Sequence, residues 1–386
     1  MKKRFYHIAV LCLAVCCLAA CHDDDGGEDN VGVKTSHHNV AFFNSLNGPG
    51  DNGYNDMILK AEMYFIMQHP ELNSTFITPS SDHSSLDDRY RINLLLPLNG
   101  DSTLVVLNGS DYTELARSID SIPLTNEMMG TTAADIRVLT FEDDGHQLPE
   151  RVYSFKVQRY GAFYVAGRLL GKTPAVVVAG MKGDPQIEDA VQGFIDGYSL
   201  ENPDGPIVHY LADDYSGFDS PDKAVYVCDS ILKTFPTEQI QKNSSNYANG
   251  VCFVPLAGGS NVGMYASVHS MSNLWDVNII GVDDNYNRNS MSIPFSIELP
   301  IWEILVDYLE DWHDNKEWPR WQSFGLDSEY PINIILSDYT FANFLKRYSN
   351  GYILHNAGED ETLEEKVKEL TKEAIEKERA YINTKT

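Results

Sequence analysis

Short apolar runs recur along the chain, and the stretches between most of them carry apolar residues at helical spacing. The runs are rich in β-branched and aromatic residues and span 40–43, 75–77, 104–107, 137–139, 175–179, 207–211, 251–254, 278–282 and 332–336. Such runs predict β-strands, and strands that alternate with helices form parallel sheets with crossover helices. There are too many strands for one small sheet. The pattern therefore predicts an α/β fold with two doubly wound lobes of parallel sheet and a hinge between them.

The order of the runs also predicts how the chain is divided. The runs separate near residue 150, and we assign 39–150 and 284–325 to a first lobe and 151–283 and 326–350 to a second. Residues 351–386 hold a last helical pattern over 359–382, with i,i+4 pairs such as Glu373 and Lys377. Its apolar face predicts a helix packed on the body, and a partner-binding helix is the alternative. That face comprises Leu363, Val367, Leu370, Ala374 and Tyr381.

The first residues have the pattern of an export signal. A basic start precedes an apolar stretch over 8–20, and small residues lead to Cys21. This order is typical of a bacterial lipoprotein signal peptide, residues 1–20, which is cut before a cysteine that becomes lipidated. A transmembrane helix is the alternative, but the apolar stretch falls short of the ~20 residues that span a bilayer. We therefore expect lipid chains on Cys21 to anchor the protein to a membrane.

The segment 21–38 is polar and acidic, and its composition predicts a disordered tether. Its acidic start, Asp23 to Asp25, resembles the signal that directs lipoproteins of certain diderm bacteria to the outer face of the outer membrane. A plain solvated spacer is the alternative. The expected location is the outer membrane with exposure at the cell surface, and the periplasmic face is the alternative.

Charge and cysteine content narrow the classes of partner. The formal net charge of −27 makes nucleic acid an improbable partner, because nucleic-acid binding depends on basic side chains. Of the six cysteines, those at 12, 16 and 17 belong to the signal peptide, and Cys21 is the lipidation site. Cys228 and Cys252 remain. A disulfide between them and two separate buried thiols are the two alternatives. No cysteine spacing indicates a metal site.

The most informative candidate site is the turn that follows the first predicted strand. Gly48, Gly50 and Gly53 allow a backbone path that other residues resist, and the helix after them offers unpaired N–H groups. A plain strand-to-helix connection is the alternative. In parallel sheets ligands bind beyond the carboxyl ends of the strands, so polar residues after later strands are candidates too. The candidate ligand-binding residues are Asp51, Tyr54, Asn55, Asn108, Met181, Gly258, Gly259, Tyr265 and Asp283.

Several motifs with known chemistry are absent from the sequence. Residues 258–263 lack the Gly-Lys-Ser/Thr ending of a phosphate loop, and Arg288 stands where a calcium loop of the EF-hand type has glycine. The eleven histidines show no HExxH spacing, and there is no Gly-x-Ser-x-Gly elbow. We expect His209, which lies within a predicted strand, to be a core histidine, with a catalytic base as the alternative. We therefore predict no cofactor, no metal and no enzymatic activity. A nucleoside or glycoside hydrolase that uses Asp51 and Asp283 is the remaining enzymatic alternative.

Motifs after five strands, in order, resemble those of one protein family. They are 50–55 with Asp51 and Tyr54, 163–167, 179–181 together with 193–197, 258–263, and 280–284. In this order they are similar to the basic membrane protein family of substrate-binding lipoproteins, over about residues 39–340. The best understood members bind purine nucleosides for an ABC transporter. The resemblance implies a type I periplasmic binding fold, with chain passages between the lobes near 150, 284 and 325.

The resemblance also implies roles for individual residues. Tyr54 and Tyr265 would sandwich a base, Asp283 would bind ribose hydroxyls, and Asp51 and Asn55 would bind polar edges. A core helix residue is the alternative for Tyr265, and a strand-end cap or hinge residue is the alternative for Asp283. The family's Thr-Ser-x-x-Lys stretch is replaced by 292–300, which has no lysine and carries Glu298.

The leading hypothesis is a lipid-anchored protein that captures a nucleoside-like small molecule for an ABC permease. The alternative is a surface protein that captures another nutrient, such as a glycan, for an outer-membrane importer.

Overall fold

The computed structural model describes most of the chain that the sequence assigns to the two lobes. The described residues are 38–45, 48–51, 53–77, 102–119, 125–126, 131–132, 136–143, 145, 147–171, 173–234, 251–271, 277–286, 292–337 and 363–385. The predicted signal peptide, Cys21 and the predicted tether up to residue 37 lie outside the described residues. Among the helices that are described, none combines the length and hydropathy that a bilayer crossing requires.

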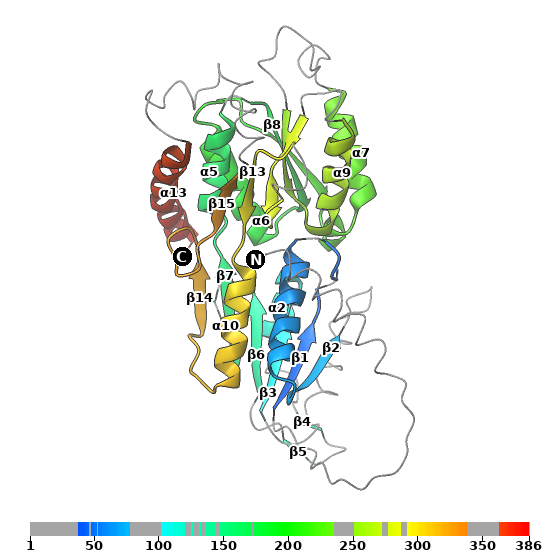
Figure 1. Ribbon diagram of the computed structural model, residues 1–386, viewed down its shortest axis with the longest axis vertical. Coiled ribbons are helices and arrows are strands. Elements are labelled where there is room, and N and C mark those ends of the chain that lie inside the picture. The colour runs from blue at the N-terminus through cyan, green and yellow to red at the C-terminus, as the bar shows by residue number, and fades with distance from the viewer. Residues whose placement is uncertain are drawn as a thin grey trace, which may run out of the picture. The chain divides into compact units, whose positions relative to one another are not determined.

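The first lobe is built on a six-stranded parallel sheet in the order β14-β7-β6-β3-β1-β2. Successive side chains of β1 point to opposite faces, as the period of two in a strand requires. Val40 and Phe42 pack under α2 and α10, whereas Ala41 and Phe43 pack with α4 (Figure 1). The strands are β1 (Asn39–Phe43), β2 (Asn73–Ile77), β3 (Thr103–Leu107), β6 (Ile136–Phe141), β7 (Val152–Val157) and β14 (Trp321–Phe324); the helices are α2 (Tyr54–Gln68), the 3₁₀ turn η1 (Ser110–Tyr112), α4 (Thr113–Arg117) and α10 (Ile301–His313). A short hairpin, β4 (Thr125–Asn126) and β5 (Thr131–Thr132), stands apart from this sheet.

The second lobe is built on a four-stranded parallel sheet in the order β11-β10-β8-β9. A three-stranded sheet, β12-β13-β15, follows it, and β15 runs antiparallel to β13. The strands are β8 (Ala175–Met181), β9 (Ile207–Ala212), β10 (Val251–Leu256), β11 (Val277–Ile279), β12 (Gly281–Asp283), β13 (Phe295–Glu298) and β15 (Asn333–Leu336). The helices are α5 (Tyr160–Leu170), α6 (Pro185–Tyr198), the 3₁₀ turn η3 (Tyr215–Phe218), α7 (Pro221–Leu232), the 3₁₀ turn η5 (Gly258–Ser260) and α9 (Asn261–Met271).

The predicted fold class is confirmed, since both main sheets are parallel and carry helices on their faces. Every run predicted as a strand contains one, although 278–282 is divided at Ile280 into β11 and β12. The runs do not include β13 and β14, of four residues each, β4 and β5, of two residues each, or the six-residue β7. All of these except β7 are too short to show a clear alternation.

The chain passes between the lobes at 158–159, 299–300 and 325–332. The first two positions differ from the expected 150 and 284. Pairing of β7 with β6 keeps the chain in the first sheet as far as Val157, although the predicted boundary placed 151–157 in the second lobe. Pairing of β13 with β12 delays the second passage until after Glu298. The third passage begins beside the expected residue 325.

Glycines at three positions allow α5 and α6 to pack closely. A Cβ atom at Gly193 or Gly197 would lie 2.1 Å from the carbonyl oxygen of Tyr160 or Tyr164, and one at Gly167 would lie 2.5 Å from that of Phe194. The resemblance motifs at 163–167 and 193–197 therefore serve helix packing here.

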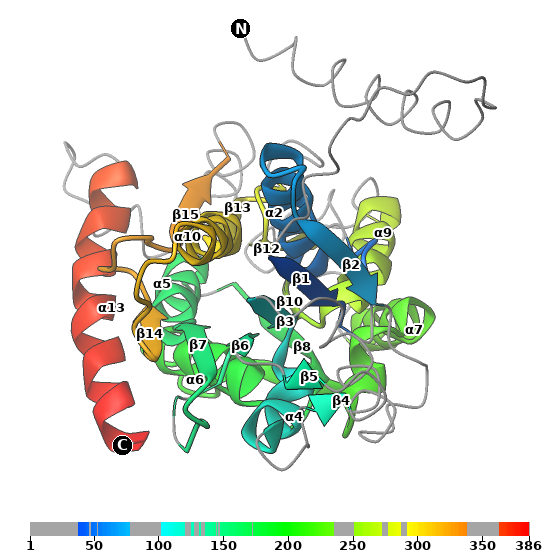
Figure 2. The same cartoon turned by 90° about the horizontal axis from the view of Figure 1, so that it is seen from below.

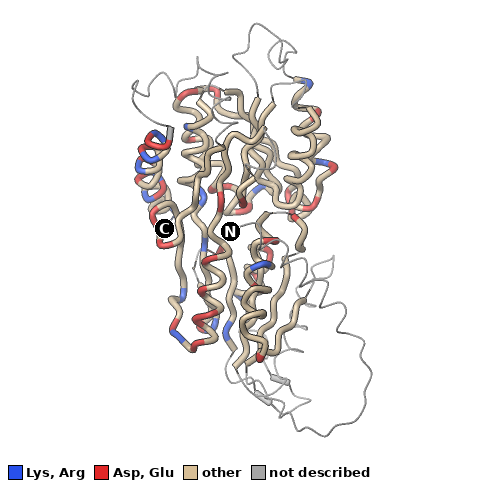
Figure 3. Tube along the Cα trace, viewed as in Figure 1, with Lys and Arg blue, Asp and Glu red and all other residues tan. Residues whose placement is uncertain are grey.

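The C-terminal helix α13 (Leu363–Lys385) packs along α5, on the side of the molecule away from α7 and α9 (Figures 1 and 2). Leu370 and Ala374 are buried in the main core, as the predicted apolar face requires. Glu373, which was expected to pair with Lys377, instead accepts hydrogen bonds from Tyr164 and Arg168 of α5. Glutamates and lysines are mixed along the rest of the helix (Figure 3).

Cys228 and Cys252 are free, buried thiols. Cys252 points from β10 to the face that packs on α5 and α6, whereas Cys228 of α7 packs on the opposite face with Val251 and Phe253. The sheet separates them, so of the two alternatives the structure has two buried thiols. Burial raises the pKa of Cys228 to about 12.

Candidate functional site

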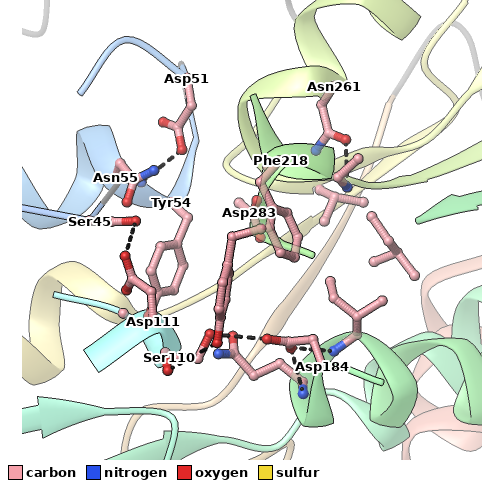
Figure 4. Close-up of a pocket in the computed structure, with 18 of the residues that line it drawn as sticks. Ser45, Asp51, Tyr54, Asn55, Ser110, Asp111, Asp184, Phe218, Asn261 and Asp283 are labelled. Atoms are coloured by element: carbon pink, nitrogen blue, oxygen red, sulfur yellow. Dashed lines mark hydrogen bonds between the residues drawn. The ribbon is translucent and has the colours of Figure 1, made fainter. Parts of the chain in front are cut away.

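A cavity lies where the two lobes meet, at the carboxyl ends of the strands of both main sheets (Figure 4). It encloses about 710 Å³ when the part open to solvent is counted. Its lining residues are Ser45, Asp51, Tyr54, Asn55, Gly109, Ser110, Asp111, Arg159, Asp184, Gln186, Ile187, Tyr215, Phe218, Leu256, Ala257, Gly258, Asn261, Val282 and Asp283.

The turn before α2 forms one wall. Gly48 and Gly50 have positive φ angles, 62° and 111°, as the sequence predicts for a turn of this kind. Asp51 is buried, and its carboxylate accepts hydrogen bonds from the backbone N–H groups of Gly53, Asn55 and Asp56, at 2.9, 3.0 and 3.2 Å. Asp51 therefore caps the N-terminus of α2, where unpaired N–H groups favour an anion. Burial nevertheless raises its pKa.

Tyr54 opens α2 and belongs to a buried polar group at the base of the cavity. Its hydroxyl donates to Glu142 at 3.5 Å, and the Arg159 guanidinium lies 5.9 Å from the centre of its ring. Arg159 and Glu142 form a buried ion pair at 2.8 Å. Burial and the Glu142 carboxylate raise the pKa of Tyr54 well above its usual range, so the phenol stays neutral. Burial acts to lower the pKa of Arg159, but Glu142, Tyr54 and Asp283 together outweigh it and the net shift of the pKa is upward.

The opposite wall carries an aromatic ring that the sequence did not single out. Phe218, the last residue of η3, faces the cavity from the second lobe (Figure 4). A Cβ at Gly180 would lie 2.5 Å from its ring, and a Cβ at Gly258 would lie 3.3 Å from it. Gly217 comes equally close to β8, since its Cβ would lie 1.9 Å from the carbonyl oxygen of Gly180. Gly180 in β8 and Gly258 after β10 therefore make room for Phe218.

The lobes also touch directly beside the cavity. Ser110 of the first lobe donates a hydrogen bond to Asp184 of the second, at 3.1 Å, and the Tyr215 hydroxyl donates to the backbone carbonyl of Ser110 at 3.3 Å. Asp184 also caps α6, because it accepts from the N–H groups of Gln186 and Ile187. Burial raises the pKa of Asp184. These contacts join the two walls beside the cavity.

Asp283 ends β12 and points into the cavity (Figure 4). Its φ angle is +75°, which is uncommon for a residue other than glycine. Among the described residues nothing donates a hydrogen bond to its carboxylate. Burial raises the pKa of Asp283 to about 7, against the opposing effect of Arg159. Strained backbone of this kind gathers at functional sites, and here it presents a carboxylate that is available to a ligand.

The charge of the lining is predominantly acidic, and acidic residues gather where the lobes meet (Figure 3). Asp51 and Asp184 are engaged by helix N-termini, and Ser45 donates to Asp111 at 3.2 Å. The single arginine of the lining is neutralised by its pair with Glu142. The cavity can therefore accept hydrogen bonds from a ligand but offers little to balance a negative charge on it.

Some of the sequence-predicted residues lie at the cavity and others do not. Those in the lining are Asp51, Tyr54, Asn55, Gly258 and Asp283. Gly259 lies just outside it, near Asp51, because its Cβ would come within 3.7 Å of that of Asp51. Asn108 is buried and donates to Glu62 of α2 at 2.7 Å, away from the cavity. Met181 ends β8 outside the lining, and Gly180 beside it contributes by making room for Phe218.

Tyr265, which was expected to be the second ring of a base sandwich, does not line the cavity. Its ring stacks on Tyr286, with centroids 4.8 Å apart, and packs against the second core. Its hydroxyl donates to the carbonyl of Ile280 at 3.3 Å and accepts from the N–H of Val282 at 3.2 Å. Tyr265 therefore supports β12 and the approach to Asp283, which is close to the core-residue alternative. The ring that stands across from Tyr54 belongs to Phe218.

The sequence contained a signal for some of the cavity residues that the candidate list missed. Glu142 directly follows β6, and Arg159, Ser45 and Gly109 each lie two residues after the end of a strand, β7, β1 and β3 respectively. The rule of strand carboxyl ends therefore applies to all four. Phe218 and Tyr215 carried no such signal. They lie in a 3₁₀ turn two residues or more beyond β9, and only the close approach of Gly217 to Gly180 brings them to the cavity.

Comparison with known proteins gives matches of structure alone. No protein-family model and no curated protein matches the sequence. A solute-binding protein of an ABC transporter system from Aeropyrum pernix K1 has a TM-score of 0.60 at 16% identity, over 90% of this chain and 89% of that one. The Caulobacter myo-inositol binding protein, bound to myo-inositol, has a TM-score of 0.54 at 14% identity, over 84% and 100%.

A transcriptional activator of the comK gene from Bacillus halodurans has a TM-score of 0.54 at 14% identity, over 81% and 95%. At these identities the matches establish the fold, which is that of the type I periplasmic binding proteins. Because the fold also occurs in a transcriptional activator, function has to be argued from the cavity.

Proposed function

We propose that the chain is an extracytoplasmic solute-binding protein that encloses one small, uncharged, hydroxyl-bearing ring molecule between its lobes. The observation that carries the proposal is Asp283, a carboxylate in the cavity to which no described residue donates a hydrogen bond, beside the rings of Tyr54 and Phe218. A carboxylate accepts hydrogen bonds from neighbouring hydroxyls, and the flat rings supply apolar contact for the faces of a sugar, cyclitol or base.

The acidic lining supports an uncharged ligand. An anionic sugar or a phosphate would bring its charge close to Asp283 and Asp111, and Arg159 is already paired with Glu142. Neutral polyols, of which the myo-inositol bound by the Caulobacter protein is one example, avoid this cost.

A nucleoside remains the finer form of the proposal that the sequence resemblance to the basic membrane protein family supports. Its base would lie between Tyr54 and Phe218, and its ribose hydroxyls would bind Asp283. This arrangement replaces Tyr265 by Phe218 and keeps the implied roles of Tyr54 and Asp283.

The hydrogen bonds that Asp51 accepts favour a binding function over a hydrolase function. The hydrolase alternative needs Asp51 as a second carboxylate, but three backbone N–H groups of α2 occupy it. Closure of the lobes on the ligand is therefore the proposed mechanism, in which contacts to both walls favour the closed arrangement.

The proposed setting is a membrane surface, supported by the signal pattern of residues 1–20 and by Cys21. The partner would be an ABC permease or, if the acidic segment after Cys21 directs the protein outward, an outer-membrane importer. Protease treatment of intact cells separates the two, because only a surface protein would be cut.

Calorimetry with a panel of neutral sugars, inositols, nucleosides and their anionic analogues tests the ligand class. We expect binding of a neutral member and weakening of about 10- to 100-fold in Asp283→Asn and in Phe218→Ala, as loss of one charge-assisted hydrogen bond or one buried ring implies. The matched controls are Asp222→Asn and Tyr226→Ala, both exposed on α7. Tight binding that both cavity variants leave unchanged would overturn the proposal.

A further inference from the structure

Two histidines and a glutamate meet at the ends of α2 and α10 that point away from the cavity. His69 caps the C-terminus of α2, Glu71 follows it, and His313 is the last residue of α10. The two helices lie side by side, and both begin where the lobes meet (Figure 1). Because α2 has 15 residues, its ends are about 20 Å apart. The cluster is therefore distinct from the cavity.

The distances within the cluster fit a metal ion. Glu71 Oε1 lies 3.4 Å from His69 Nδ1 and 3.2 Å from His313 Nε2. One ligand atom from each of the three residues falls within 4.8 Å of the others. Ligands at the ~2.0–2.1 Å typical of tetrahedral zinc lie about 3.3 Å from one another. Two imidazoles and one carboxylate form a donor set that zinc accepts, with the fourth position left to solvent.

The surroundings orient both rings as in known metal sites. The second nitrogen of His69, Nε2, lies 2.9 Å from a carboxylate oxygen of Glu310, and the second nitrogen of His313, Nδ1, lies 3.4 Å from Asp314. Histidines that bind metals commonly hold a carboxylate with the other nitrogen, which fixes the tautomer and the ring. The buried ring of Phe65 lies against His69, with centroids 4.8 Å apart. His69 Nδ1 and His313 Nε2 both lie within 3.4 Å of the Glu71 carboxylate, and the centroids of their rings are 3.9 Å apart.

We propose that His69, Glu71 and His313 form a site for Zn²⁺ that ties the ends of α2 and α10 together. The ion would replace the weak contacts of Glu71 with both rings by coordinate bonds. Nearby Glu310 and Asp314 add negative charge that favours a cation. The site does not depend on the proposed function, because it lies at the other end of α2 from the cavity.

Titration of the full chain with ZnCl₂ tests the proposal, using protein purified without a polyhistidine tag and treated with a chelator. We expect one equivalent of Zn²⁺ to bind, and His69→Ala, His313→Ala and Glu71→Gln each to weaken binding at least about tenfold. Glu310→Gln should weaken it about 10- to 100-fold by freeing the ring of His69. Zn²⁺ should also raise the melting temperature of the wild type and have a smaller effect on the variants.

The control is His269→Ala, which removes an exposed histidine of α9. Glu71 is largely exposed, so its replacement by glutamine keeps the test valid even if a histidine variant folds poorly. Absence of a stoichiometric site would overturn the proposal, and so would Zn²⁺ binding that His69→Ala, His313→Ala and Glu71→Gln leave unchanged.

Discussion

Glu62 offers the most quantitative test of the structure. It lies on the buried face of α2 with no exposed surface, and Asn108 Nδ2 donates a hydrogen bond to its Oε1 at 2.7 Å. Within the described residues, Glu62 Oε2 and Asn108 Oδ1 have no hydrogen-bond partner. A buried carboxylate without a cation is costly, so the neutral acid is favoured. Burial accordingly raises the pKa of Glu62 from 4.5 to about 8.

The raised pKa predicts how stability changes with pH. Between pH 4.5 and about 8 the folded protein holds a proton on Glu62 and the unfolded chain does not. The stability that protonated Glu62 contributes to the folded protein is therefore fully present below pH 4.5 and is lost as the pH rises through 8. The interval, 8 minus 4.5, is 3.5 pH units. At ~1.4 kcal/mol per unit the loss is about 5 kcal/mol.

The variant Glu62→Gln removes this titration and keeps the shape of the side chain. We expect its free energy of unfolding, relative to the wild type, to rise steadily between pH 5 and pH 8 by an amount on the order of 3–4 kcal/mol. Urea denaturation of both proteins at each pH measures the difference. Titration of other buried acids, such as Asp283 and Glu378, is common to both proteins and cancels.

The matched control is Glu114→Gln, which removes a carboxylate from the surface of the same lobe. A difference between Glu62→Gln and the wild type that stays constant from pH 5 to pH 8 would refute the reasoning.

Three further predictions concern the cavity, the helix packing and the C-terminal helix. Because the pKa of Asp283 is about 7, affinity for a hydroxyl-bearing ligand should rise up to about tenfold between pH 6 and pH 8, and calorimetry should find no such rise in Asp283→Asn. Gly193→Ala places a Cβ 2.1 Å from the carbonyl oxygen of Tyr160 and should lower the free energy of unfolding by about 1–3 kcal/mol in urea denaturation. Glu378→Ala removes the carboxylate that accepts from the N–H of Gly161 at 2.6 Å, and should lower stability by about 1–3 kcal/mol and expose α13 to proteolysis.

Each of these predictions has its own control. Affinity that rises equally in Asp283→Asn would show that another group titrates. Gln192→Ala, at the exposed position next to Gly193, should change stability little, and equal losses at the two positions would contradict the packing argument. Glu376→Ala is the exposed counterpart of Glu378→Ala on the same helix, and an equally stable Glu378→Ala protein would contradict the capping role.

The fold could be predicted from sequence because buried parallel strands appear in the sequence as continuous apolar runs. β1, β3, β8 and β10 are apolar on both faces, since helices cover both sides of each sheet. The passages between the lobes could not be placed as well. β7 and β13 belong to their sheets through pairing with strands elsewhere in the chain, and pairing is not visible in a local pattern.

The candidate site was predicted best where the chemistry is local. Asp51, Tyr54 and Asn55 follow one strand and begin one helix, so their position at a strand end could be inferred from a few residues. Tyr265 follows a similar glycine-rich turn, but its position on α9 directs the ring toward Tyr286 and the backbone of β12. The sequence alone does not determine toward which neighbours a side chain on a helix points.

The cluster of His69 and His313 illustrates the same limit. Glu71 and His313 are separated by 242 positions, so no spacing rule can connect them. They meet because α2 and α10 have similar lengths and lie side by side on one sheet.

The central claim is that the cavity between Tyr54 and Phe218 holds an uncharged, hydroxyl-bearing ring molecule. A crystal structure of the protein with the panel member that binds most tightly tests it directly. We predict that the ligand ring lies between Tyr54 and Phe218, with at least one hydroxyl within hydrogen-bond distance of Asp283. A ligand bound elsewhere on the protein, or one in the cavity whose negatively charged group faces Asp283, would contradict the account.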